Sequence, residues 1–449
     1  MQPFRLHVFV CEQQKPEGLP CCGARGGRNV AEALRREIAM RGLAGEVLVT
    51  ACGSLGLCER GPNMVVYPEG VWYSGVRAED AAEIVESHFR NGQPVVRLRN
   101  TDEPDVRREI ETNRDRFLAA MRAKDAAGAL PDELVALIGA FRESRAMLTA
   151  IELDLFDAVG EGGTAPEIAA RLAADLRATE MLLNALVAMG MLARQDGAFR
   201  NTHVAARYFT SASPDHARMA MMHQVRLWRA WSHLTESVRT GRPAPPEKDP
   251  WTDAFIAAMH RNASTGAPPV VAAIGTEGVR RMLDVGGGSA AYSIAFARAN
   301  PELRAEVLDR DVVVGIAERH IREAGLAGRV TTRIGDLRRD DLGSGYDLVL
   351  VSAICHMLSP GENADLLRRC HAALVPGGRV AVQDFILNPD KTAPRFGALF
   401  SLNMLVNTEA GASYSEPEYT RWLENAGFQE IQRISVPGAP ASVMLGTRH

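Results

Sequence analysis

The sequence predicts an α/β protein with a C-terminal doubly wound sheet, a central all-helical region and a small N-terminal α/β domain. Strand and helix patterns alternate from Arg281 onward, which is typical of a parallel sheet covered by helices. Residues 132–270 show helical periodicity almost throughout. The first 90 residues follow a βαββα pattern and hold five of the seven cysteines. These three observations fix the order of the parts.

Composition narrows the class of protein. The chain has 449 residues, of which 46% are hydrophobic and 24% are charged, so a disordered, collagen-like or coiled-coil chain is excluded. A net charge of −4 gives no bulk electrostatic attraction to nucleic acid or to an anionic membrane. No apolar run approaches the roughly 20 residues of a membrane span, and no basic leader precedes the short apolar start. We expect a cytoplasmic protein that binds no nucleic acid.

The N-terminal elements follow from short apolar runs and turn residues. The pattern predicts strands over 6–10 and 47–50, a helix over 26–41, a hairpin over 64–73 and a closing helix over 78–89. We therefore expect one domain over residues 1–92. The next stretch is charged and poor in large apolar residues, which favours a linker over 93–130, helical over 107–124.

The central region, expected over residues 131–270, contains a winged helix-turn-helix pattern. A helix from Thr164 is followed by a second helix over 178–191 and by a hairpin with Asp196 and Gly197 at its tip. A DNA-reading helix needs outward Arg, Lys, Asn or Gln side chains. The second helix has one Asn, no basic residue and apolar residues nearly all round, so we expect it to be buried rather than to read DNA.

The C-terminal region, expected over residues 271–449, carries a ligand-binding pattern. Predicted strands cover 282–285, 305–308, 330–334, 348–351 and 379–383. Asp284, Gly286 and Gly288 stand where the first strand turns into a helix, and Asp309 and Asp336 end the next two strands. Doubly wound sheets bind ligands at the carboxyl ends of their strands. Three acidic residues there favour a positively charged ligand over a pyrophosphate.

A family resemblance adds to this pattern. From about residue 130 onward, the chain resembles the S-adenosylmethionine-dependent O-methyltransferases of the plant caffeate and bacterial hydroxyneurosporene type. The matching segments keep their order: Ser144–Phe156, the winged helix, Leu283–Gly288, Tyr346–His356 and Leu374–Gly378. The resemblance implies a Rossmann-like class I methyltransferase sheet, and a homodimer built through the winged-helix region.

The resemblance also assigns roles to residues. Gly286 and Gly288 would bracket the methionine part of S-adenosylmethionine, with Asp284 in the same turn. Asp309 would bind the ribose, while Asp336 and Leu337 would contact the adenine. Trp228, Trp231, Met259, Phe400, Asn403 and Met404 are candidates to line the acceptor pocket, and we choose Met259, Asn403 and Met404 among them.

His356 occupies the family's general-base position, just past the fourth strand. A histidine with an ordinary pKa near ~6.5 suits the removal of a phenolic or enolic proton. Plant relatives flank this base with two glutamates, whereas this chain has Asp384 at one position and Ser413 at the other. The alternative is methyl transfer driven mainly by proximity and in-line alignment.

The N-terminal cysteines predict a metal centre. Thiolates of Cys11, Cys22, Cys52 and Cys58 can hold a [2Fe–2S] cluster, and the Cys-x-x-Cys knuckles usual for zinc are absent. Residues 5 to about 90 resemble the thioredoxin-like [2Fe–2S] ferredoxins, on four matching segments: Val10–Cys11, Cys22–Gly26, Leu55–Pro62 and Tyr67–Tyr73.

One departure from that family leaves the ligand set open. The family usually has a cysteine where this chain has Ser54, and we assign its role to Cys52. Ligation by the Ser54 hydroxyl, ligation by Cys21 and a domain without a cluster are the alternatives.

Taken together, these patterns predict an S-adenosylmethionine-dependent O-methyltransferase with an accessory [2Fe–2S] domain. We expect its small-molecule acceptor to be a hydroxyl on an aromatic, polyketide, isoprenoid or quinol-like compound, and an electron-transfer partner is possible. A C-methyltransferase acting on a tetrapyrrole-like acceptor is one alternative. A redox-responsive iron–sulfur regulator that uses the winged helix is the other.

Overall fold

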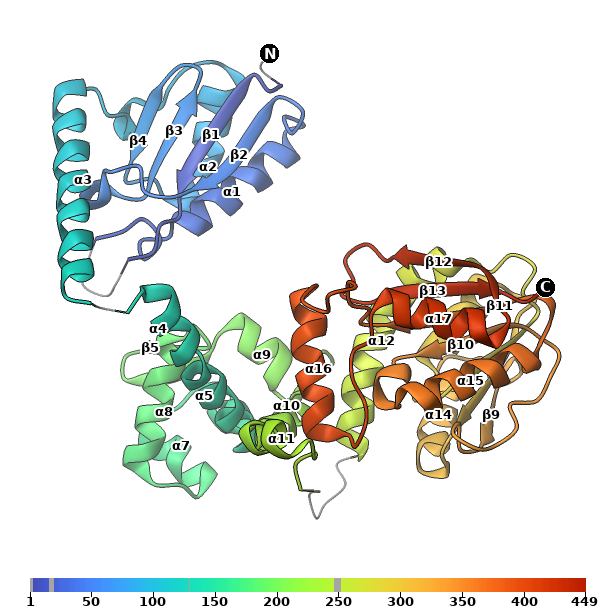
Figure 1. The fold of residues 1–449 in the computed structure, drawn as a ribbon. Helices are drawn as coiled ribbons and strands as arrows, with labels where there is room; N and C mark the ends of the chain where they lie inside the picture. The colour runs from blue at the N-terminus through green and yellow to red at the C-terminus, as the bar shows by residue number, and fades with distance from the viewer. Residues whose placement is uncertain (1–2, 16–19, 129, 246–251) are drawn as a thin grey trace. The chain divides into compact units, whose positions relative to one another are not determined.

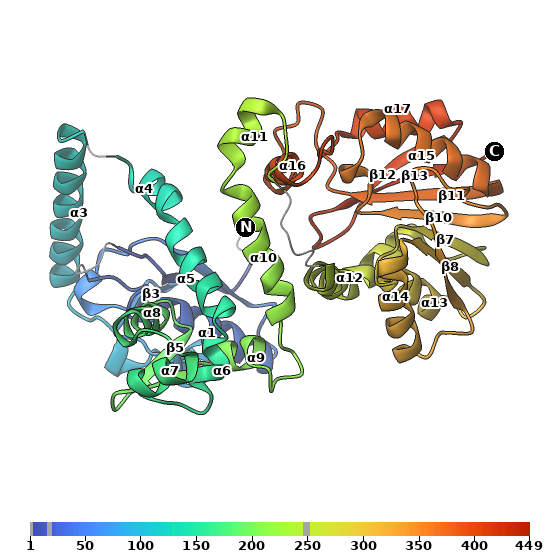
Figure 2. The same cartoon turned by 90° about the horizontal axis from the view of Figure 1, so that it is seen from below.

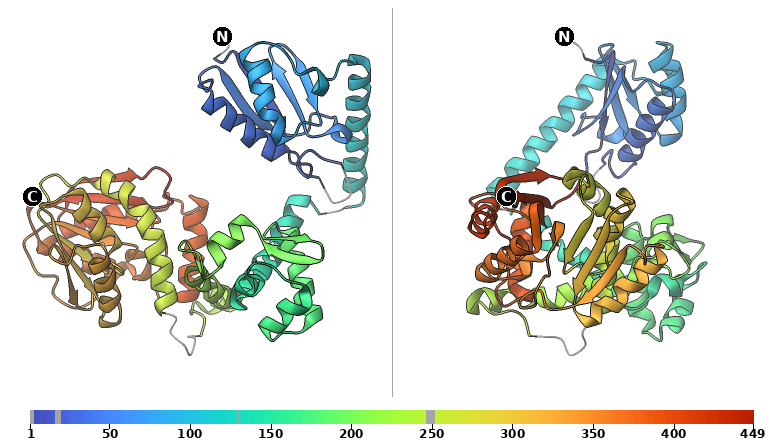
Figure 3. Two further views of the ribbon diagram at one scale, coloured as in Figure 1. Left: turned by 180° about the vertical axis from the view of Figure 1, so that it is seen from behind. Right: turned by 90° about the vertical axis from the view of Figure 1, so that its right-hand side faces the viewer.

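The computed structural model describes residues 1–449 except 1–2, 16–19, 129 and 246–251. The chain divides into two compact units, residues 1–138 and 139–449. Figures 1 and 3 show the elements of each unit. Within the described residues, every helix is either too short or too polar to cross a membrane.

The N-terminal unit contains the predicted βαββα order. Its four-stranded sheet has the order β2-β1-β3-β4, in which β1 and β2 are parallel and β3 and β4 are antiparallel. The strands are β1 (Leu6–Cys11), β2 (Val47–Cys52), β3 (Asn63–Tyr67) and β4 (Val71–Ser74). Helix α1 (Gly27–Met40) connects the parallel pair, and α2 (Ala81–Glu83) continues into a π-helical segment, Ile84–Arg90.

The segment expected to be a linker contains a 24-residue helix, α3 (Glu103–Ala126), which packs on the N-terminal unit. Arg60 forms ion pairs with Asp105 and Glu109 on this helix. Asn113 donates a hydrogen bond to the carbonyl oxygen of Gly56 at 2.7 Å. The first half of α3 is therefore held by specific contacts. Helix α4 (Asp132–Gly139) follows.

The central helical region begins the second unit and contains the predicted winged-helix elements. They are α5 (Phe141–Glu152), α6 (Leu155–Val159), α7 (Ala165–Leu172), α8 (Leu176–Ala188), β5 (Leu192–Gln195), β6 (Ala198–Asn201) and α9 (His203–Phe209). Asp196 and Gly197 both have positive φ, as a two-residue hairpin turn requires. The expectation that the second helix is buried all round is wrong for the single chain, since α8 buries one face and leaves Met181 56% exposed.

Further helices among the described residues lead from this region to the C-terminal sheet. They are α10 (Arg218–Trp231), α11 (Leu234–Thr240) and α12 (Thr252–Ile274). Helix α12 contains Pro268 and Pro269 and contributes its last turns to the core beneath the sheet.

The C-terminal sheet has seven strands in the order β12-β13-β11-β10-β7-β8-β9. Its strands are β7 (Arg281–Val285), β8 (Arg304–Asp309), β9 (Val330–Ile334), β10 (Tyr346–Ser352), β11 (Leu374–Asp384), β12 (Gln429–Ser435) and β13 (Ser442–Thr447). The five predicted strands are present and parallel. The sheet as a whole is mixed, because β13, for which no strand was expected, pairs antiparallel with both β11 and β12.

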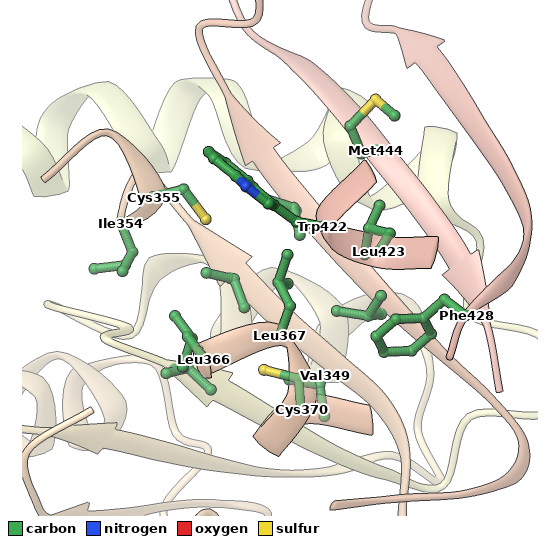
Figure 4. Close-up of a cluster of buried hydrophobic side chains, with 14 of the residues drawn as sticks. Val349, Ile354, Cys355, Leu366, Leu367, Cys370, Trp422, Leu423, Phe428 and Met444 are labelled. Atoms are coloured by element: carbon green, nitrogen blue, oxygen red, sulfur yellow. The ribbon is translucent and has the colours of Figure 1, made fainter. Parts of the chain in front are cut away.

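Helices cover both faces of this sheet, as Figure 2 shows. One core cluster packs the sheet against α15 (Pro360–Ala373) and α17 (Glu416–Ala426). Figure 4 shows part of this cluster, with Trp422 and Leu367 between the sheet and the two helices. The other cluster packs it against α12, α13 (Ala291–Ala299) and α14 (Asp311–Glu323). Helix α16 (Arg395–Asn407) follows β11.

Candidate active site

The turn after β7 is built so that only glycine fits at two positions. Gly286 has a φ of 70°, and a Cβ there would lie 2.4 Å from Cδ1 of Ile354. A Cβ on Gly287 would lie 2.6 Å from the carboxyl carbon of Asp284. The backbone is consequently bare on this turn, which allows a ligand to approach it closely.

Asp284 supports this turn from inside the protein. Its side chain is fully buried, and burial, together with the charge of Asp309, raises its pKa to about 7. The Ser293 hydroxyl donates a hydrogen bond to Oδ2 at 2.7 Å, while Oδ1 is buried with no hydrogen-bond partner among the described residues. The predicted binding role of Asp284 is therefore one of support within the turn rather than of exposed contact.

Asp309 lies at the end of β8, where its carboxylate meets the glycine turn. The Gly288 N–H donates to Oδ2 at 2.8 Å, and the Arg310 N–H donates to Oδ1 at 2.7 Å. These bonds hold the carboxylate at the carboxyl edge of the sheet. Each oxygen keeps a lone pair that ribose hydroxyls can use.

Asp336 and Leu337 follow β9. The Arg338 N–H and the Arg339 side chain both donate to the Asp336 carboxylate and lower its pKa. Leu337 packs against the core, and its Cδ2 would lie 3.3 Å from a Cβ on Gly286. Leu337 thus lies beside the glycine turn, whereas the Asp336 carboxylate is bound by Arg338 and Arg339 of its own loop.

His356 and Asp384 form a buried pair. His356 lies in a short 3₁₀ turn (Cys355–Met357) after β10, and Asp384 ends β11. His356 Nδ1 is 2.7 Å from Asp384 Oδ1, and the His356 N–H donates to Oδ2 at 3.0 Å. Burial opposes ionisation of Asp384, yet the neighbouring His356 and the hydrogen bonds lower its pKa below the usual range. A carboxylate in this position fixes the imidazole tautomer and leaves Nε2 for proton transfer.

Aromatic rings surround this pair. The Phe400 ring stands edge-on to the His356 ring with centroids 4.9 Å apart, and the Phe385 centroid is 6.1 Å from it. Phe396 extends the group, since its ring centroid lies 4.9 Å from that of Phe385 and its side chain is 49% exposed. The histidine therefore stands in an apolar, aromatic environment that suits a flat acceptor.

The three predicted acceptor residues lie on two helices. Asn403 and Met404 are on α16, where Asn403 Oδ1 accepts a hydrogen bond from the Trp231 indole at 2.9 Å and Met404 is buried. Met259 is half-buried on α12. The Asn403 side chain thus joins α16 to α10, and the Phe400 ring on the same helix approaches His356 directly.

The predicted cysteine ligands gather at one end of the N-terminal sheet. Cys11 and Cys52 are register partners on β1 and β2, and the Cys22 thiol hydrogen-bonds to Cys11, which lowers the Cys11 pKa to about 6 against the effect of burial. Cys58 Sγ is 3.0 Å from Lys15 Nζ and 3.5 Å from the Ser54 hydroxyl.

These thiols do not form a closed set of metal ligands. No group of three or more His, Cys, Asp or Glu side chains is placed to hold a metal ion in the part of the chain that the structure describes. Cysteine thiolates are the donors of an iron–sulfur cluster, so the residue types fit such a centre, although the four side chains do not converge on one point.

Sequence reasoning missed several residues of the site. Ile354 closes over the glycine turn, Ser293 holds Asp284, and the Tyr419 hydroxyl donates to Asp384 Oδ2 at 3.1 Å. Tyr419 lies on α17, 35 positions after Asp384, and no local pattern marks it. Of the phenylalanines around His356, Phe396 and Phe400 lie on α16 and Phe385 directly follows β11, and only Phe400 was a candidate.

Comparisons with known proteins agree with this geometry. Residues 231–429 match the O-methyltransferase domain, and residues 135–211 match the O-methyltransferase dimerisation domain. The 3-hydroxy-5-methyl-1-naphthoate 3-O-methyltransferase of Streptomyces sahachiroi is 36% identical over 323 residues, which cover 69% of this chain and 93% of that protein. The tetracenomycin polyketide synthesis 8-O-methyl transferase of Streptomyces glaucescens is 30% identical over 331 residues, which cover 71% of this chain and 97% of that protein.

A solved structure gives the same result. Human N-acetylserotonin methyltransferase in complex with SAM superposes with a TM-score of 0.62 at 27% identity, over 70% of this chain and 96% of that one. The matched dimerisation domain supports a homodimer. The two family matches begin at residues 135 and 231, so residues 1–134 lie outside both family domains. On this evidence, the chain belongs to the S-adenosylmethionine-dependent O-methyltransferases that carry an N-terminal dimerisation domain.

Proposed function

We propose that this chain methylates a hydroxyl group on an aromatic or polyketide-type acceptor, with His356 as the general base. The observation that carries the proposal is the buried pair of His356 Nδ1 and Asp384 Oδ1, 2.7 Å apart, at the carboxyl end of β10 and β11. Two of the relatives described above are named as a 3-O-methyltransferase of a hydroxynaphthoate and an 8-O-methyl transferase of tetracenomycin polyketide synthesis.

The pair determines where the proton goes. Asp384 accepts a hydrogen bond from Nδ1–H, so the neutral imidazole presents an unprotonated Nε2. Nε2 accepts the proton of the acceptor hydroxyl while the hydroxyl oxygen forms its bond to the methyl carbon. S-adenosylmethionine supplies that carbon as a sulfonium methyl group, and the carbon–sulfur bond breaks to give the methyl ether and S-adenosylhomocysteine. Burial of the histidine excludes water from this step.

The glycine turn and the strand ends would hold S-adenosylmethionine. We assign the methionine part to the bare backbone at Gly286 and Gly288, and the ribose to Asp309. Leu337 would pack on the adenine, with Asp336 beside it. The contact between Gly288 and Asp309 supports this assignment, because it ties two of the proposed contacts into one rigid element.

We assign the acceptor to the space beside the phenylalanines, with Met259, Asn403 and Met404 as further lining residues. The test is an assay of the purified protein with S-adenosylmethionine and a panel of hydroxylated naphthoates and related aryl acids. We expect one added methyl group on a ring hydroxyl, detected by mass spectrometry together with stoichiometric S-adenosylhomocysteine. Methylation of ring carbons or amines, with none of the hydroxyls modified, would contradict the proposal.

We further propose that residues 1–92 form a thioredoxin-like [2Fe–2S] domain, joined through 93–130 to the dimerisation region (131–270) and the catalytic domain (271–449). The gathering of Cys11, Cys22, Cys52 and Cys58 at one sheet end supports it. Donors already point at two of these sulfurs: Lys15 contacts Cys58, and Asn63 contacts Cys22 at 3.3 Å. Donors of this kind stabilise a thiolate-bound cluster. An electron-transfer partner follows only if the cluster is redox-active.

Anaerobic reconstitution tests the cluster and its ligands. We expect two irons and two sulfides per chain, with an electron paramagnetic resonance signal after reduction. Cys52→Ser should lose or shift that signal, because a hard oxygen replaces a soft thiolate, whereas Ser54→Ala should leave it unchanged. Loss of the signal in Ser54→Ala, with the signal of Cys52→Ser intact, would instead assign the fourth ligand to Ser54. Zinc at one per chain without iron would contradict the cluster.

A further inference from the structure

Tyr419 on helix α17 places its hydroxyl in the core, beside the buried pair of His356 and Asp384. The Tyr419 side chain is 1% exposed, and its hydroxyl donates a hydrogen bond to Asp384 Oδ2 at 3.1 Å. Its ring packs edge-on against Tyr414 and Trp422, with centroids 6.3 and 5.4 Å away. Packing thus holds the phenol in one orientation, with its hydroxyl directed at the carboxylate.

The carboxylate of Asp384 receives four hydrogen bonds. Oδ1 accepts from His356 Nδ1 at 2.7 Å and from the Phe385 N–H at 2.8 Å. Oδ2 accepts from the His356 N–H at 3.0 Å and from the Tyr419 hydroxyl. Three of the donors come from the segments that carry the pair itself. Tyr419 is the one donor from a distant element, and without it a buried carboxylate oxygen would lose half of its partners.

We propose that Tyr419 is a positioning residue for methyl transfer: its hydroxyl keeps Asp384 ionised and aimed at His356 Nδ1, so that Nε2 is the atom that takes the proton. The inference rests on the proposed role of His356 as the base. It adds a residue on α17 that touches neither cofactor nor acceptor and acts through Asp384.

The other titratable groups around Asp384 remain neutral near pH 7. Burial raises the pKa of the Cys355 thiol after β10 well above its usual value, and raises that of Cys370 on α15 to about 12. Burial also raises the pKa of Tyr414 to about 12 and holds that of Tyr419 well above its usual value. The histidine and the aspartate, joined by the bond from Nδ1 to Oδ1, are therefore the groups between which a proton is held there.

The sign of the effect follows from the charge of the pair. The active form, a neutral imidazole with an ionised carboxylate, carries one negative charge, and protonation of the pair removes it. A hydroxyl that donates to the carboxylate stabilises the negative form more than the neutral one. Loss of this donor therefore raises the pKa of the pair, and the acidic limb of the pH–rate profile moves to higher pH.

The test compares two tyrosines. Tyr419→Phe removes the donor to Asp384. Tyr414→Phe is the matched control, because its hydroxyl donates to the backbone oxygen of Leu358 at 2.5 Å and it is equally buried. For Tyr419→Phe we expect the acidic limb of the kcat/KM profile to move to higher pH by about one unit. The value of kcat/KM should therefore fall roughly tenfold near pH 6 and about threefold or less near pH 9. Affinity for S-adenosylmethionine should hold. The control should show no pH-dependent defect.

A second substitution keeps the test decisive if Tyr419→Phe does not fold. Tyr419→3-fluorotyrosine keeps the ring and makes the hydroxyl a stronger donor, so the acidic limb should move to lower pH. Unchanged limbs in the variant that folds would overturn the role of Tyr419. His356→Asn, assayed in parallel, separates the two proposals, since a near-normal rate there would overturn the proposed base instead.

Discussion

Gly287 provides a direct test of the cofactor turn. Its φ is not positive, so strain in the backbone does not require glycine; the constraint is space. A Cβ would lie 2.6 Å from the Asp284 carboxyl carbon, where ordinary contact begins at 3.4 Å, and 2.9 Å from a Val307 methyl carbon. Asp284 is fully buried and held by Ser293, so it cannot swing away. The turn itself must move by about 0.8 Å.

The cost of that movement has two parts. Overpacking of this size destabilises proteins by about 1–3 kcal/mol, which we expect for Gly287→Ala in denaturant unfolding of the C-terminal unit. The shift also carries the Gly288 N–H away from Asp309, so we expect S-adenosylmethionine to bind at least about tenfold more weakly, or ~1.4 kcal/mol, by calorimetry.

Gly328→Ala is the matched control for Gly287→Ala. Gly328 also has an ordinary φ, but a Cβ there meets nothing within 4 Å. This substitution should be neutral or stabilise the chain by about 0.4–1 kcal/mol through the unfolded state, with unchanged affinity for S-adenosylmethionine. If the two variants behaved alike in unfolding and in calorimetry, the reasoning about the turn would be refuted.

Three further predictions follow from the site and from α3. Burial raises the pKa of Asp284 to about 7, so the native state loses stability as pH rises from about 4 to 7. In urea unfolding without ligand, the free energy of unfolding of Asp284→Asn, relative to that of the natural protein, should rise by roughly 2–3 kcal/mol between about pH 5 and pH 8. A constant difference between the two proteins would contradict this. Asp309→Ala should weaken S-adenosylmethionine binding by about 1.5–3 kcal/mol in calorimetry, and unchanged affinity would remove Asp309 from the site. Arg60→Ala breaks two partly exposed ion pairs to α3, so it should change stability by about 1 kcal/mol or less yet speed hydrogen exchange over residues 103–126; exchange at the natural rate would contradict the packing of that helix.

The local patterns of the sequence identified most of the elements around the site. The five parallel strands, the glycine turn and the acidic strand ends each have a signal within a few residues, because turn chemistry and strand periodicity are local properties. The placement of Asp384 beside His356 depended on the family pattern, which relates the end of β11 to the turn after β10. In the structure, His356 Nδ1 and Asp384 Oδ1 lie 2.7 Å apart.

Features that depend on long-range packing were not predictable in this way. The antiparallel strand β13 enters the sheet between β11 and β12, and its position is set by tertiary pairing rather than by its own residues. Tyr419 reaches Asp384 only because α17 packs on the sheet. Likewise, the charged residues of α3 indicated exposure, whereas Arg60 binds two of them. Such partners become visible only in three dimensions.

The central claim is that His356 takes the proton of the acceptor hydroxyl, and His356→Asn tests it most directly. Asparagine can still donate to Asp384 but has no counterpart of Nε2, so the support of the site is retained while the base is removed. The assay measures a single turnover with an acceptor that the natural protein methylates. We expect the rate of methyl transfer to fall by ~10²–10⁴-fold, while S-adenosylmethionine binds with its normal affinity. A rate close to that of the natural protein between about pH 6 and 9 would show that alignment alone drives methyl transfer, and would contradict the account.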